Sequence, residues 1–110
     1  EQAYYITQWY PKPAVFDADG WHQMPYLDQG EFYSEYGSFD VSVTLPKNYV
    51  LAATGDRIDA EEEEEFLNNL VGDALMKIDR GQYSREMSFP PSSQQLKTVR
   101  FKQYRVHDFA

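Results

Sequence analysis

Residues 39–45, with the sequence FDVSVTL, restrict the fold more than any other stretch of the chain. Apolar side chains stand at every second position from Phe39 onward, and the residues between them are polar or charged. Because side chains alternate between the two faces of a strand, this period of two predicts a β-strand with one buried face. Residues 46–48 (PKN) predict a turn, and residues 49–54 (YVLAAT) predict a second strand that returns antiparallel to the first.

Residues 59–80 predict one long helix. Asp59 is a candidate N-cap, glutamates fill positions 61–65, where the helix dipole favours negative charge, and Gly81 can end the helix. The apolar residues that follow fall at helical spacing on one face: Phe66, Leu67, Leu70, Val71, Ala74, Leu75 and Ile78. We interpret the glutamate run as the solvated start of a helix and not as a cation site.

The first twenty residues predict short, interrupted strands. Residues 4–8 are aromatic and β-branched and predict a strand, which Pro11 and Pro13 end because each removes a backbone donor. Residues 15–16 can resume a strand briefly. The sequence DADG at 17–20 is typical of a turn, because Asp bonds nearby amides and Gly accepts a positive φ.

The rest of the chain alternates between loops and one last extended stretch. Residues 21–35 lack a clear period and predict a long packed loop, and residues 88–95 predict a Pro-rich loop. Residues 96–110 predict a final strand, with a shift of phase near 104–106 that indicates a β-bulge. The predicted fold class is therefore mainly β with one inserted helix at about 59–80.

Composition limits the possible partners. The length of 110 residues fits a single domain with a modest core, and the net charge of −8 disfavours nucleic acid and anionic membranes as partners. No apolar run is long enough to span a membrane, and no signal-peptide pattern is present. The absence of cysteine excludes disulfides, thiolate zinc sites and cysteine nucleophiles. The opening at Glu1 and the strand that stops at Ala110 suggest one partial domain, residues 1–110, of a larger protein.

No complete catalytic set is visible in the sequence. His22 and His107 lie far apart and belong to no zinc motif, and no nucleophile elbow, P-loop or dinucleotide fingerprint occurs. His22 is expected to pack beside Trp21, and His107 to lie on a strand face. Two acidic pairs, at 17/19 and 31/35, are interpreted as turn formers or surface groups. We therefore predict no catalytic residue, no metal ligand and no cofactor within this chain.

Several longer motifs, in a fixed order, do resemble a known family. They are Thr7-Gln8-Trp9-Tyr10-Pro11, Gly20-Trp21-His22, Pro25-Tyr26, Gly30-Glu31-Phe32-Tyr33, Phe39-Asp40-Val41, Leu45-Pro46, Ala52-Ala53-Thr54-Gly55, Met87-Ser88-Phe89-Pro90-Pro91-Ser92-Ser93 and Val106-His107-Asp108-Phe109-Ala110. Together they resemble the amino-terminal domain of aminopeptidase N-type zinc metallopeptidases (the gluzincin aminopeptidases), in the bacterial branch with the Gln-Trp-Tyr-Pro signature. The likeness covers nearly the whole chain except the acidic helix.

The resemblance implies a division of labour between domains. In that family the amino-terminal domain is a saddle-like antiparallel β-sandwich that rests on a separate catalytic domain, which carries the zinc ion and its ligands. This chain would be the later part of the saddle domain, with the catalytic domain absent, and would be inactive alone. Its expected partners are its own catalytic domain and a peptide substrate, and its expected location is outside the cytoplasm of a bacterium, in the periplasm or secreted.

The resemblance also implies a substrate-binding role for Gln8 and Tyr10. Family members use a Gln at the position of Gln8 to hold the free α-amino group of the substrate, often with an acid or amide where this chain has Tyr10. A Gln carbonyl can accept a hydrogen bond from an ammonium, and a Tyr ring can offer it a cation–π face. The alternative is that Gln8 is a structural amide that satisfies loop backbone groups.

Two other functions remain open from the sequence. The many aromatic residues suit a free-standing β-sandwich module that binds peptide or carbohydrate, and a purely structural adaptor is also possible. Whichever holds, strand edges exposed in a partial domain are prone to pair with other chains. We expect self-association through the strand at 99–109 or the strand at 4–8.

Overall fold

The longest strand, β3 (Gly37–Pro46), confirms the prediction made from the alternating sequence. In the computed structural model, which describes residues 3–30, 32–82 and 88–110, β3 pairs antiparallel with β5 (Leu96–Val106) along almost its whole length. Exposed and half-buried side chains alternate along β3 from Ser38 to Leu45. The apolar positions of β3 therefore face the core, as their period of two requires.

The predicted hairpin between residues 39–45 and 49–54 is wrong. The turn forms, with the Tyr49 amide donating to the Pro46 carbonyl at 3.0 Å, but residues 49–54 do not become a strand. Leu51 and Ala53 instead pack on the apolar face of the sheet, in contact with its buried core. β5 has an alternating pattern with β-branched residues, so it pairs with β3 more favourably than the segment at 49–54, which has small residues at 52 and 53. β3 therefore pairs with β5, although β5 is more distant in the sequence.

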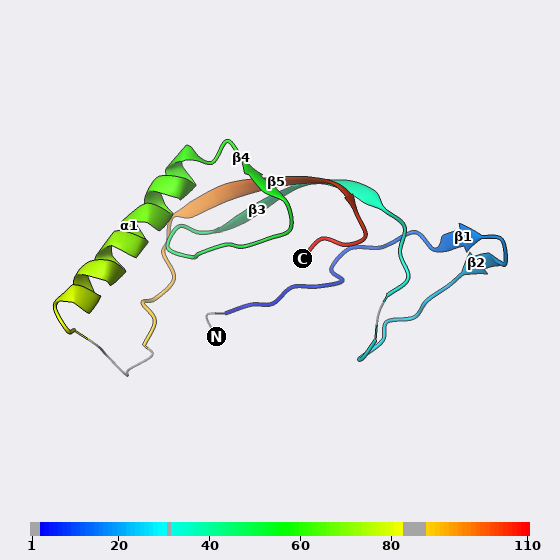
Figure 1. Cartoon of the computed structure of the whole chain (residues 1–110), viewed down its shortest axis with the longest axis horizontal. Coiled ribbons are helices and arrows are strands. Elements are labelled where there is room, and N and C mark those ends of the chain that lie inside the picture. The colour runs from blue at the N-terminus through cyan, green and yellow to red at the C-terminus, as the bar shows by residue number, and fades with distance from the viewer. Residues whose placement is uncertain (1–2, 31, 83–87) are drawn as a thin grey trace.

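The chain then adds one short strand to the other side of β5. Strand β4 (Asp56–Ile58) pairs antiparallel with residues 100–102, which gives a three-stranded sheet of order β3-β5-β4. Figure 1 shows this sheet as a curved ribbon with helix α1 beginning at one end. β5 is the middle strand, and β4 covers its second edge at residues 100–102. Self-association through the strand at 99–109, which we expected from the sequence, therefore has no open strand edge at these three residues.

The predicted bulge near residues 104–106 is confirmed. Gly37 lies opposite Val106 and Phe39 opposite Gln103, so β5 holds one more residue than β3 across this step. Arg105 takes up the extra residue with a φ of 56°. This irregularity bends the end of β5, and the chain turns back from it toward the C-terminus (Figure 1).

Gly55 lies where two backbones approach closely, which makes it a test of the fold. Its φ is +95°, and a Cβ built there would overlap the Lys102 carbonyl and lie 2.8 Å from the Gln103 Cβ. We predict that Gly55→Ala lowers the free energy of unfolding by about 2 kcal/mol in urea titrations. The control is Gly72→Ala in the helix, where a Cβ meets nothing within 4 Å, and which should instead stabilise by up to about 1 kcal/mol. Equal effects of the two changes would contradict this interpretation of Gly55.

Helix α1 (Glu61–Asp79) confirms the one predicted helix, with changes at its start. Ala60, not Asp59, occupies the N-cap, and no side chain caps the first turn. Asp59 has a φ of 52°, which shows that it belongs to the turn leading into the helix. Gly81 ends the helix as predicted, with a φ of +65° and its amide bonded to the Ile78 carbonyl at 2.9 Å.

The glutamate run is solvated except at one position. Glu63 is 6% exposed, and both of its carboxylate oxygens accept from the Lys97 ammonium of β5, at 2.9 and 2.6 Å. The same ammonium lies 4.0 Å from the centre of the Phe66 ring. This pair attaches the first turns of α1 to the sheet. Farther along, the apolar face predicted for the helix is more than 40% exposed at Leu70, Val71, Leu75 and Ile78.

The predicted strand at residues 4–8 is wrong, whereas the brief strand at 15–16 and the turn at 17–20 are confirmed. The loop predicted for residues 21–35 is wrong at its start, because residues 21 and 22 belong to a second strand. Residues 4–8 run in a non-regular path (Figure 1), because the positive φ of Gln8, 51°, is incompatible with a continuing strand. Strands β1 (Val15–Asp17) and β2 (Gly20–His22) form a separate two-stranded antiparallel sheet around the DADG turn. Inside the turn, the Asp19 amide donates to Asp17 Oδ1 at 2.9 Å.

The core is small and lies under the middle of the larger sheet. Val99 and Phe101 of β5 pack with Phe109, and each is at most 5% exposed. Around them lie half-buried apolar side chains from distant parts of the chain: Tyr10, Phe39, Val41, Leu45, Leu51 and Ala53. The fold is therefore mainly β with one helix, in two small antiparallel sheets without a barrel. No helix among the described residues is long and apolar enough to cross a membrane.

Candidate functional site

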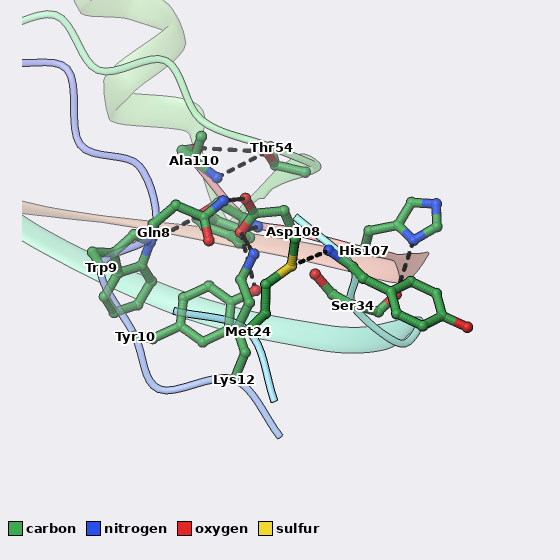
Figure 2. A network of polar contacts seen from close by, with 12 residues as sticks. Gln8, Trp9, Tyr10, Lys12, Met24, Ser34, Thr54, His107, Asp108 and Ala110 are labelled. Atoms are coloured by element: carbon green, nitrogen blue, oxygen red, sulfur yellow. Dashed lines mark hydrogen bonds and ion pairs between the residues drawn. The ribbon is translucent and has the colours of Figure 1, made fainter. Parts of the chain in front are cut away.

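Asp108 connects the Gln8–Lys12 segment to the end of the chain. Its Oδ2 accepts a hydrogen bond from Gln8 Nε2 at 2.5 Å, and its Oδ1 accepts one from the Tyr10 hydroxyl at 3.1 Å. The Lys12 ammonium lies 3.0 Å from the same Oδ1. Figure 2 shows the three side chains converging on this single carboxylate. The structure thus brings together the two residues predicted to bind substrate, Gln8 and Tyr10.

Two further contacts hold the two residues that follow Asp108. The Trp9 indole Nε1 donates to the Phe109 carbonyl at 2.8 Å, and the rings of these residues pack edge to face with centres 6.4 Å apart. The Thr54 amide donates to the Ala110 carbonyl at 2.9 Å. The backbone that follows Asp108 is therefore held in place, in part by Thr54 on Ala110 (Figure 2).

Gln8 itself adopts a strained backbone. Its φ of 51° lies in the left-handed region, which is uncommon for a residue with a long side chain. The carboxylate can only accept hydrogen bonds, so it fixes the Gln8 amide with its nitrogen toward Asp108. Within residues 3–30, 32–82 and 88–110, no donor forms a hydrogen bond to the side-chain carbonyl oxygen of Gln8. Gln8 therefore keeps an oriented hydrogen-bond acceptor that the described part of the fold does not use.

Lys12 is held by charge and by aromatic rings. Its Nζ is buried and makes no hydrogen bond to any described residue, so its contact with Asp108 is an ion pair without hydrogen-bond geometry. The ammonium lies 5.4 Å from the centre of the Tyr10 ring and 5.8 Å from that of Phe32, within cation–π range. Removing Asp108 would leave this cation buried without a counter-charge.

The protonation of the network follows from these contacts. Burial raises the pKa of Asp108, but Lys12, the Phe109 amide and the Tyr10 hydroxyl together outweigh burial, so the net pKa is below its ordinary value. Burial, and then the hydrogen bond to Asp108, raise the pKa of Tyr10 to about 12. The network therefore holds a charged carboxylate beside a neutral phenol at neutral pH.

The raised pKa of Tyr10 predicts a loss of stability in alkali. The phenol ionises near 10.0 when the chain is unfolded and near 12 when it is folded, so the folded state holds its proton more tightly. The stabilisation is complete below pH 10 and is lost as the pH rises toward 12. We expect Tyr10→Phe to flatten the decline of the urea midpoint between these pH values. A decline of the same steepness in Tyr10→Phe would show that another group causes it, and Tyr5→Phe, at a phenol that is 94% exposed, is the control.

The histidines and the other predicted groups lie outside this network. His22 contacts Asp17, with Nε2 2.7 Å from Oδ1, and packs edge-on against the Tyr33 ring. The pKa of Asp17 is lowered mainly by its hydrogen bond with His22 and then by the Asp19 amide. Tyr33 lowers it further, because its hydroxyl donates to the other oxygen of Asp17 at 3.1 Å. His107 lies beyond the end of β5 with its ring 4.0 Å from that of Tyr36. The acidic pair at 31/35 and the motif residues at 31 and 87 fall partly outside the described residues.

Metal binding has no visible basis in the described ranges. Residues 3–30, 32–82 and 88–110 contain no group of three His, Cys, Asp or Glu side chains close enough to hold a metal ion.

The residues that sequence reasoning missed are Lys12 and Asp108. Asp108 lies 100 positions from Gln8, and no local pattern in a single sequence indicates such a contact.

A shallow groove lies beside the Gln8 segment. It has a volume of about 420 Å³ and is lined by residues 4–7, 52–54 and Ala110.

Comparisons with protein-family models, with curated proteins and with solved structures gave no match for this chain. The assignment of a function therefore depends on the chemistry of the Gln8 network and on the motif resemblance.

Proposed function

We propose that this chain is the later part of the amino-terminal β domain of a bacterial, zinc-dependent aminopeptidase-like metallopeptidase, and that it helps to hold the amino terminus of a peptide substrate. The observation that carries the proposal is the state of Gln8. Its amide nitrogen is fixed on Asp108, and its carbonyl oxygen is not used by the described residues. A primary ammonium needs oriented acceptors of this kind.

The neighbours of Gln8 suit that role. The Asp108 carboxylate adds negative charge behind the amide, although Lys12 balances part of it. The Tyr10 hydroxyl donates its hydrogen bond to Asp108, and the Tyr10 ring packs against Trp9 and Phe39. The clearest contribution of Tyr10 is therefore to hold Asp108 in place. A direct cation–π contact between Tyr10 and the substrate stays a prediction.

Bond cleavage is assigned to the catalytic domain of the proposed parent protein and not to this chain. A catalytic zinc site needs three protein ligands and an open position, and the described residues provide no such group. The chain contributes positioning, as a surface that packs on the catalytic domain and faces the substrate. The parent enzyme would act on peptides outside the cytoplasm.

Two measurements test this proposal. The gene should be sequenced beyond the codon for Ala110, where an HExxH motif within the next few hundred codons is expected and its absence would overturn the proposal. The 110-residue chain should also be dialysed against zinc and analysed for metal. We expect far less than one equivalent and no cleavage of aminoacyl reporters, and one tightly bound equivalent of zinc would contradict the assignment of zinc to another domain.

A second candidate function rests on the β1–β2 hairpin. Phe16 and Trp21 are 61% and 69% exposed, and their ring centres lie 4.9 Å apart on one face of the hairpin. Exposed aromatic pairs of this kind can stack on sugar rings or peptide side chains, as a free-standing binding module would require. Tryptophan fluorescence titrated with oligosaccharides would detect such binding, and its loss in Trp21→Ala, with none in Gln8→Ala, would favour this alternative.

A further inference from the structure

The outer edge of β3 is an open strand edge in the described fold. In the three-stranded sheet the order is β3-β5-β4, so β3 pairs on one side only. It is 10 residues long, or roughly 33 Å, whereas the other outer strand, β4, has only 3 residues. β3 therefore presents by far the longer row of unsatisfied backbone donors and acceptors.

This edge lacks the features that usually prevent pairing. Natural edge strands are protected by Lys, by Pro, by bulges or by inward-pointing charges. β3 contains no Lys, its single Pro is its last residue, and its apolar face is uncharged. Asp40 is its one charged residue, and Arg100 and Lys102 of β5 already neutralise it, at 2.6 and 3.2 Å. An edge of this kind favours strand addition.

The sequence of β3 is complementary to itself. We propose that the β3 edges of two copies of this chain pair antiparallel about a two-fold axis at Ser42, joining their sheets into one. This register places Val41 opposite Val43 of the second copy and Phe39 opposite its Leu45, so the apolar faces join. Asp40 then lies opposite Thr44 of the second copy, and no like charges face each other.

Two alternative registers fit less well. A shift by one residue would place each apolar side chain opposite the wet face of the second strand. A two-fold axis at Asp40 would set two carboxylates directly opposite each other, which is unfavourable. An axis at Ser42 lies at the middle of the stretch from Ser38 to Pro46 and pairs nearly the whole strand.

This pairing uses a different edge from the two that the sequence indicated. The segment at 4–8 forms no strand, and β5 lies between its two neighbours. The inference does not depend on the proposed role of Gln8, which lies outside β3. A failure of one would leave the other unchanged.

A cysteine crosslink tests the axis directly. The chain contains no cysteine, so any disulfide in Ser42→Cys must join two copies. Residues directly opposite each other in antiparallel strands have Cα atoms about 4.5–5.5 Å apart, within the range that a disulfide spans. We expect Ser42→Cys to form a covalent dimer on mild oxidation. Thr98→Cys is the matched control on the same wet face, because the two copies of residue 98 would be separated by three strand spacings, roughly 14 Å across the sheet, and would also be offset along the strands.

Solution measurements decide whether the pairing occurs without a crosslink. Sedimentation of the unmodified chain from about 10 μM to 1 mM should show a concentration-dependent dimer. Ser42→Lys and Ser42→Glu should each weaken it by up to roughly five-fold, and an equimolar mixture of the two should restore it. Circular dichroism of each variant confirms its folding. A monomer at all concentrations, a dimer unaffected by either charge, or equal crosslinking of Ser42→Cys and Thr98→Cys would overturn the inference.

Discussion

Replacing Asp108 with alanine is expected to lower the free energy of unfolding by about 3 kcal/mol, the largest effect of any single change in this network. The carboxylate accepts from Gln8 and Tyr10 and faces the Lys12 ammonium. Its loss leaves that ammonium buried with no counter-charge. The partial exposure of Asp108, 33% of its side chain, keeps the figure at the lower end for a broken buried pair.

Matched variants separate charge from packing in the Asp108 experiment. Asp28→Ala, at an exposed loop aspartate, should change the stability by less than about 0.5 kcal/mol. Lys12→Met introduced into Asp108→Ala should recover part of the loss, because it removes the uncompensated cation while keeping an apolar stem. Urea unfolding of all four proteins gives these values. A double variant that is less stable than Asp108→Ala would contradict the role assigned to the ammonium.

Acid provides a second check on Asp108. Because the pKa of Asp108 is lowered in the folded protein, its stabilisation is present above the unfolded value of about 3.8 and is lost as the pH falls below it. The unmodified chain should therefore lose stability more steeply below pH 4 than Asp108→Ala.

Local pattern was sufficient to predict much of this fold. The alternation around Val41 predicted β3, the capping and apolar spacing predicted α1 to within two residues at its start, and the phase shift predicted the bulge at Arg105. Each of these features is encoded within a few neighbouring residues. The turn at Asp17 was predictable for the same reason.

Long-range pairing was not predictable in this way. The sequence at 49–54 has the composition of a strand, but β3 pairs with residues fifty or more positions away, and no local sequence pattern indicates which pairing is favoured. The same limit applies to the site. Gln8 and Tyr10 were identified through the family resemblance, whereas Asp108, which holds both, could be found only in the folded structure. Tyr10 shows the same limit, since the sequence indicated only that its ring can offer a cation–π face, and the structure shows that the residue is half-buried.

Gln8 should affect the parent enzyme selectively. If its carbonyl holds the substrate's ammonium, Gln8→Ala removes a charge-assisted hydrogen bond worth about 1.5–3 kcal/mol, a roughly ten- to hundred-fold loss in kcat/KM. The loss should appear for peptides with a free amino terminus and be nearly absent for acetylated ones. Gln23→Ala, at an exposed residue after β2, is the control and should leave both substrates unaffected.

The structure makes the Gln8 experiment more demanding, because Gln8 also bonds Asp108. Gln8→Ala will therefore cost some stability, which must be measured separately by thermal unfolding of the full-length protein. Asp108→Asn removes the charge of Asp108 but keeps an oxygen that can accept from the Gln8 side-chain amide. It therefore tests how Asp108 orients the Gln8 side chain while leaving Gln8 itself unchanged. If Gln8 is a substrate-binding residue, Gln8→Ala should change free and acetylated peptides unequally at a temperature where every variant is folded. Equal losses on the two substrates, or losses that follow the melting temperature alone, would make Gln8 a structural amide that joins the amino-terminal segment to Asp108.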